Sequence, residues 1–84
     1  MIISTERWSE ILQIVRRNPA TRWRIDGDDG FSRCGCITHL PLGPPEVWEV
    51  TDKIHVGDGS VGESILLGHI RAIAQESDRQ NDHP

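Results

Sequence analysis

The sequence predicts an α+β fold that is mainly helical, with two to three amphipathic helices and a short β-hairpin. Three observations lead to this prediction. Apolar residues recur with helical spacing near the N-terminus and again between residues 61 and 73. Between these segments, residues 21–25 alternate polar and apolar side chains, the pattern of a half-buried strand, and a turn-forming run follows. Together the segments predict a single small globular domain over residues 1–76.

The first helix is expected to begin at Ser4 or Thr5, because either side chain can accept a backbone N–H bond as an N-cap. The apolar residues that follow at positions i, i+3, i+4 and i+7 are Trp8, Ile11, Leu12 and Val15. Asn18 and Pro19 are expected to end the helix, since the residue before a proline is disfavoured in the α region.

A hairpin is expected next, with residues 21–25 as its first strand and residues 31–33 as its return. Aspartate and glycine suit the intervening turn at 26–30, because both tolerate the backbone angles of tight turns. Residues 34–40 fit either a strand or a single helical turn. The prolines and glycine of residues 41–45 predict a loop.

Residues 45–56 are compatible with a helix or a strand. In a helix, Pro45 would occupy the favoured first turn, and Val47, Val50 and Ile54 would share one face. In a strand, apolar residues would alternate, and the valine, isoleucine and threonine content favours β structure. The helix is the preferred interpretation.

A last helix is expected to begin at the capping-box spacing of Ser60 and Glu63. Its apolar face would contain Val61, Ile65, Leu66, Ile70 and Ile73. Residues 77–84 contain no apolar side chain and are expected to form a disordered polar tail.

The chain has 84 residues, so its core is expected to be thin, and a homodimer is one way to bury more surface. The longest apolar runs are far shorter than the roughly 20 residues of a membrane-spanning helix. Because the first residues also lack an apolar signal segment, a cytoplasmic protein without membrane association is expected.

Charge is divided unevenly along the chain. The first 24 residues carry five arginines against two glutamates, a balance of +3, whereas the remainder carries eleven acids against four bases, a balance of -7. An acidic body repels the phosphates of nucleic acid, so nucleic acid is not the expected partner. A protein partner with a basic surface is expected instead.

The leading hypothesis is therefore a small non-enzymatic protein, bacterial or phage in type, that acts as a protein-interaction or regulatory module through an acidic surface. The acids expected to contact the partner are Asp26, Asp28, Asp29, Glu46, Glu49 and Asp52. By analogy with anti-CRISPR proteins and DNA mimics, one form of this hypothesis is an inhibitor that covers a nucleic-acid-binding protein. The order of a glycine-preceded cysteine patch, a tryptophan-bearing element and a C-terminal amphipathic helix is similar to that in small bacterial and phage proteins, which implies no activity.

A second hypothesis is a metal-binding or thiol-redox protein, because Cys34, Cys36 and His39 place three soft-metal ligands within six residues. Zinc would suit these ligands and requires four in a tetrahedral arrangement. A bend at Gly35 is expected to be necessary for both sulfurs to reach one ion. The fourth ligand would be His55, His69 or Asp29. Apart from zinc, no cofactor is expected.

A third hypothesis is a nucleic-acid binder that uses the arginine-rich N-terminal third, where arginines surround Trp23. The alternative interpretation is that Trp23 belongs to the core and the arginines pair with acids. Catalytic and ligand templates fail: the segment from Asp26 lacks the glycine and glutamate of a calcium loop, and the G-x-G-x-x-G at residues 57–62 lacks a dinucleotide fold around it. The sequence therefore favours a non-enzymatic role.

Overall fold

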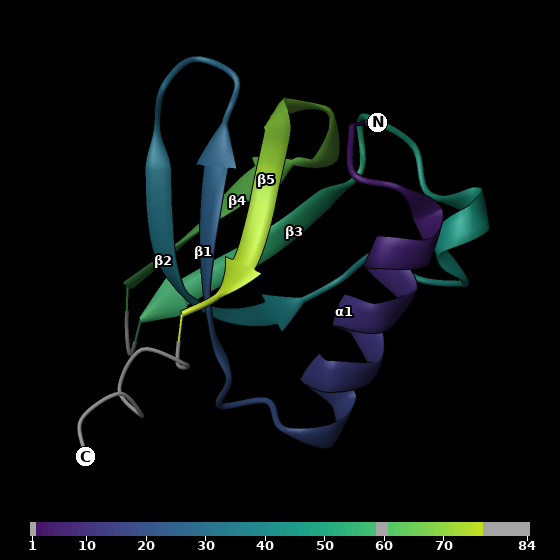
Figure 1. The fold of residues 1–84 in the computed structure, drawn as a ribbon, viewed down its shortest axis with the longest axis horizontal. Coiled ribbons are helices and arrows are strands. Elements are labelled where there is room, and N and C mark those ends of the chain that lie inside the picture. The colour runs from purple at the N-terminus through teal and green to yellow at the C-terminus, as the bar shows by residue number, and fades with distance from the viewer. Residues whose placement is uncertain (1, 59–60, 77–84) are drawn as a thin grey trace.

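The computed structural model describes residues 2–58 and 61–76. The elements follow the order α1 (Thr5–Arg17), β1 (Arg22–Gly27), β2 (Ser32–His39), the 3-10 turn η1 (Pro45–Val47), β3 (Lys53–Asp58), β4 (Val61–Leu66), the 3-10 turn η2 (Leu67–His69) and β5 (Ile70–Gln75). The strands form one five-stranded antiparallel sheet in the order β4-β3-β2-β1-β5 (Figure 1). The expected polar tail and Ser60 lie outside the described residues.

The prediction of a mainly helical fold is wrong, because α1 is the one α-helix in the described residues and five strands supply the rest of the framework. The preferred helix over residues 45–56 is replaced by η1, a loop and β3. The expected last helix is replaced by β4, η2 and β5. Both segments are rich in valine and isoleucine, which pack well on a pleated surface, and the second contains Gly62 and Gly68, which weaken helices.

The N-terminal helix and the hairpin are confirmed. Ser4 caps α1 by accepting a hydrogen bond from the Arg7 backbone N–H at 3.1 Å, and the helix ends at Arg17, two residues before Pro19. β1 and β2 form the hairpin, although both strands are longer than expected. In particular, β2 continues through His39, which settles the ambiguous segment as a strand.

The sheet is bent, and β2 belongs to both of its halves. Residues 32–36 of β2 pair with β1, whereas Cys36 and the residues after it pair with β3. In Figure 1, β1 and β5 lie in front while β3 and β4 cross obliquely behind them. Gly35 lies at the bend, where an added Cβ would be only 2.6 Å from the carbonyl oxygen of Gly57. A glycine is required here because the two halves approach each other so closely.

The core lies between the inner face of the bent sheet and α1. Its buried members are Trp8, Ile11, Trp23, Ile25, Ile37, Trp48, Ile54, Val56, Ile65, Leu67, Ile70 and Ile73. The interpretation of Trp23 as a core residue is therefore confirmed. Trp8 and Trp48 meet edge to face with ring centroids 5.7 Å apart, a geometry that adds about 0.5–1.5 kcal/mol beyond the burial of their area.

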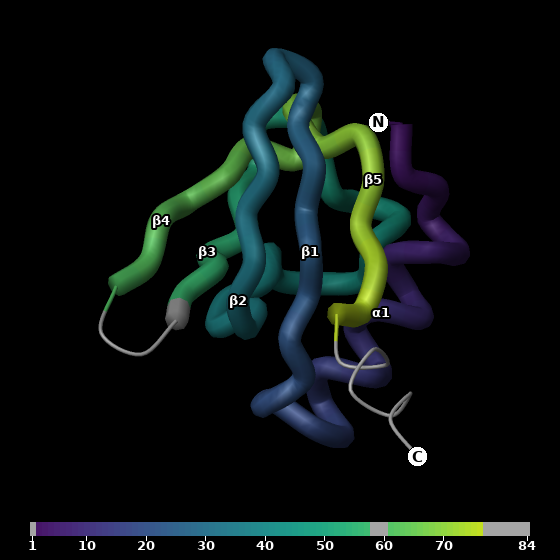
Figure 2. Tube along the Cα trace, turned by 60° about the vertical axis from the view of Figure 1, so that its left-hand side comes forward, coloured from purple at the N-terminus to yellow at the C-terminus, as the bar shows by residue number. Residues whose placement is uncertain are grey.

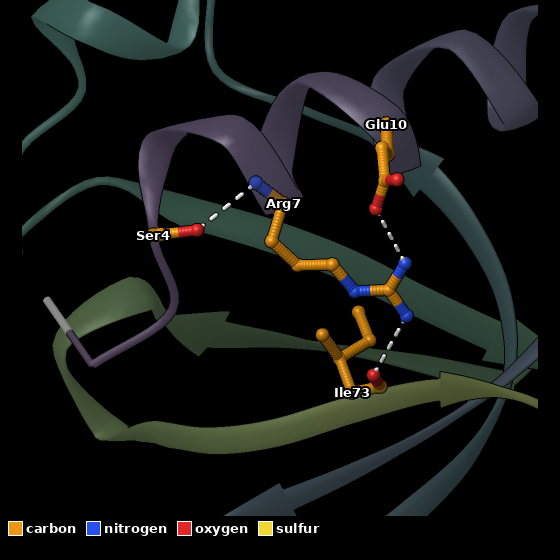
Figure 3. Close-up of polar contacts among 4 residues, drawn as sticks. All are labelled: Ser4, Arg7, Glu10 and Ile73. Carbon is orange, nitrogen blue, oxygen red and sulfur yellow. Dashed lines mark hydrogen bonds and ion pairs between the residues drawn. The ribbon is translucent and has the colours of Figure 1, made fainter.

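Helix α1 also contacts the last strand. A guanidinium nitrogen of Arg7, Nη2, donates a hydrogen bond to the backbone carbonyl of Ile73 at 3.1 Å (Figure 3). The same guanidinium pairs with Glu10 on the next turn of the helix, at 3.1 Å. Among the described residues, no helix has the length and apolar character needed to cross a membrane.

Candidate interaction surface

The longest link between strands, residues 40–52, joins β2 to β3 and is called here the β2–β3 connection. Trp48 anchors it, because its ring is 5% exposed and packs on Trp8. Its indole N–H donates to the carbonyl of Gly43 at 3.1 Å, which closes the proline-rich segment into a loop. Gly43 has a φ of +82°, a left-handed conformation that favours glycine.

The second half of the connection is tied to η2. The backbone N–H of Gly68 donates to the carbonyl of Val50 at 3.0 Å, and that of Leu67 donates to the carbonyl of Asp52 at 2.8 Å. The Asp52 carboxylate also accepts a hydrogen bond from the backbone N–H of Glu49 at 2.8 Å. These bonds hold the backbone of residues 49–52 in one conformation.

Three large apolar side chains of this connection point outward. Their exposed fractions are 92% for Leu42, 62% for Val47 and 51% for Val50, and we call them the apolar ridge. Single exposed apolar residues are common, whereas these three lie on one short, anchored segment, which makes it a candidate contact surface. The ridge was not predicted from the sequence, because Val47 and Val50 were expected on one face of a helix. The sequence feature that could have indicated the ridge is the presence of apolar residues within a proline- and glycine-rich loop.

Two of the six acids predicted to bind a partner flank the ridge. Glu46 and Glu49 are exposed and alternate with Val47 and Val50 along the chain. Asp52 is half-buried, and its carboxylate already bonds the backbone of Glu49, so its role is to shape the connection.

The other three predicted acids lie at the β1–β2 turn. Asp26 accepts a hydrogen bond from the Ser32 hydroxyl at 2.8 Å and pairs with Arg24 at 3.5 Å. Asp28 and Asp29 are exposed, and the backbone N–H of Asp28 donates to the carbonyl of His69 at 2.9 Å. The two acidic segments therefore both contact η2, but they are separate connections with different surroundings.

The two cysteines share the outer face of β2. Cys34 is paired with Arg24 of β1, and Cys36 with Arg22, in the antiparallel register. Residues i and i+2 of a strand project to the same side, so both thiols lie on one face of the sheet. Both thiols are free, and the Cys36 sulfur lies 3.5 Å from the carbonyl oxygen of Ala20.

The surroundings of Cys34 disfavour its thiolate. Desolvation of the sulfur raises the pKa of the Cys34 thiol, and a hydrogen bond to Glu76 and the charge of that carboxylate raise it further. Arg24 and Arg22 act in the opposite direction with smaller effect. Since the thiolate is the reactive form, these surroundings lower the reactivity of Cys34.

His39 pairs with a residue other than the cysteines. It lies opposite His55 of β3, with the two rings perpendicular and their centroids 5.8 Å apart. The His55 Nδ1 is 3.2 Å from the hydroxyl oxygen of Ser64 on β4. In the ranges 2–58 and 61–76, no three of the histidine, cysteine, aspartate and glutamate side chains are grouped so as to hold a metal ion.

Two of the arginines predicted to contact nucleic acid are paired with acids. Arg22 pairs with Glu76 at 3.0 Å, and Arg24 pairs with Asp26. Outside that third of the chain, Arg33 pairs with Glu63 at 3.0 Å. These exposed pairs add little to stability, at most about 1 kcal/mol each, but they reduce the positive potential of the surface.

Comparison with known proteins gives no further guide: no family model, no curated protein and no solved structure matches this chain.

Proposed function

We propose that the protein is a non-enzymatic interaction module that binds a protein partner with a basic surface at the apolar ridge. The observation that carries this proposal is the outward projection of Leu42, Val47 and Val50 from a connection held in place by Trp48. Glu46 and Glu49 supply the negative charge that selects a basic partner.

The anchored backbone supports this role energetically. Binding to a flexible loop is opposed by the entropy lost when the loop becomes ordered. Here the hydrogen bonds of Trp48, Glu49 and Val50 already order the connection, so more of the contact energy contributes to affinity. An apolar centre with a charged rim is also the usual composition of a protein interface.

The decisive experiment is selection of a displayed random-peptide library on the immobilised full chain. We expect selected peptides to combine lysine or arginine with large apolar residues. The Val47→Ser variant should bind the selected peptides about tenfold more weakly, equivalent to about 1.4 kcal/mol.

Ile2→Ser is the matched control, because Ile2 is 61% exposed and Val47 is 62% exposed. Its affinity for the selected peptides should equal that of the unmodified chain. Glu46→Lys should weaken binding, and the loss should shrink as salt is added, since salt screens exposed charges. Selection of acidic peptides, or equal losses in Val47→Ser and Ile2→Ser, would contradict the proposal.

A further inference from the structure

The two edge strands of the sheet differ in the contacts that their outer sides make. β5 forms one edge, and its Ile73 carbonyl is occupied by Arg7 of α1 (Figure 3). β4 forms the other edge and, within the described residues, pairs with β3 alone. Residues 61–64 of β4 are all exposed, and Figure 2 shows this strand as the outermost element on its side of the molecule.

The β4 edge has few of the features by which sheet edges avoid pairing. Its register with β3 runs through six consecutive pairs without a shift, whereas the β1–β5 and β2–β3 ladders are both irregular. Residues 61–66 contain no proline and no lysine, the residues that most often protect an edge. A straight, exposed edge of this kind is a template for another strand.

The charge of β4 indicates which strand it accepts. Glu63 is its one charged residue, and Arg33 neutralises it within the chain at 3.0 Å. This edge therefore does not attract the basic partner proposed for the apolar ridge. It matches a strand whose charge is neutralised within its own chain, and a second β4 is such a strand.

We propose that β4 pairs antiparallel with β4 of a second copy of this chain, about a two-fold axis at Ser64. In this register Ser64 faces Ser64 of the second copy, and Glu63 faces the Ile65 position. A register centred on Glu63 would instead place two carboxylates opposite each other, which is destabilising. The closed two-fold pairing joins two five-stranded sheets and removes both exposed edges.

The test uses sedimentation velocity of the full chain over a range of concentrations. The unmodified chain should form a dimer, and Ser64→Lys and Ser64→Glu should each raise the dimer dissociation constant at least tenfold, because like charges would meet at the axis. An equimolar mixture of the two variants should restore the dimer, since unlike charges then face each other.

Ala72→Lys is the control, because Ala72 is exposed on β5 and faces Asp26 of β1 across the ladder. It should dimerise like the unmodified chain. Circular dichroism and urea unfolding of each variant establish that it is folded. A monomer at every concentration, a dimer unaffected by both Ser64 variants, or a mixture of folded variants that stays monomeric would overturn the proposal. Failure of the dimer would leave peptide binding at the apolar ridge unaffected, since the two surfaces share no residues.

Discussion

The β1–β2 turn and the β2–β3 connection are both acidic and both contain a glycine with positive φ, yet their side chains behave differently. In the turn, the Phe31 ring folds inward over Gly27, and Asp28 and Asp29 project into solvent. In the connection, Trp48 folds inward while apolar residues project outward. This difference is the basis of the proposal that an anchored display of apolar side chains between acids, rather than acidity alone, forms the contact surface.

The anchoring role of Trp48 is tested most directly by removing its side chain. Trp48→Ala should reduce the free energy of unfolding by about 3–5 kcal/mol, because it deletes a buried aromatic ring and its contact with Trp8. Urea unfolding followed by circular dichroism measures the loss. Val47→Ala, which removes exposed atoms of the same connection, should change stability by less than about 0.5 kcal/mol. Similar losses in the two variants would contradict the anchoring role of Trp48.

A matched pair of glycine substitutions tests the backbone of the turn against that of the connection. Gly43 (φ +82°) and Gly30 (φ +89°) both have left-handed conformations, so alanine at either should cost about 1–2 kcal/mol. An added Cβ at Gly43 would also lie 3.3 Å from Val47, whereas at Gly30 it would meet nothing within 4 Å. We therefore expect the larger loss at Gly43, measured by urea unfolding. A larger loss at Gly30 would show that the connection is the more adaptable of the two.

The smallest changes in stability are expected from substitutions of single acids. They distinguish an acid that shapes the backbone from one that is only exposed to solvent. Asp52→Ala removes the acceptor for the Glu49 backbone N–H and should cost about 1 kcal/mol, the usual effect of losing a side-chain cap. Asp28→Ala leaves the backbone bond to His69 in place and should change stability by less than about 0.5 kcal/mol. Thermal unfolding of both variants under identical conditions compares them, and equal effects would show that the Asp52 carboxylate does not shape the connection.

Part of the proposed contact surface was named from the sequence, and its role in binding stays a prediction. Glu46 and Glu49 could be named from charge alone, because exposed acids need no particular neighbour to be recognised. The ridge could not, because the exposure of Val47 depends on the inward turn of Trp48 onto a helix more than thirty residues earlier in the chain. Nor could the pairing of His39 with His55 be foreseen, since cross-strand register is not contained in local spacing.

By itself, the sequence determined the first helix and the hairpin. Ser4, the helical spacing from Trp8 and the stop before Pro19 act within a few residues, and the aspartate–glycine turn is equally local. The other strands depend on tertiary contacts. The apolar residues between positions 53 and 75 have a spacing compatible with a helix. In the folded chain, the backbone of this segment is instead hydrogen-bonded in the sheet, through pairing with β2 and β1. The same pairing places Ile54, Ile65, Ile70 and Ile73 together in the core. Contacts distant in sequence outweigh a helical preference of a few tenths of a kcal/mol per residue, so these strands exist only because the sheet does.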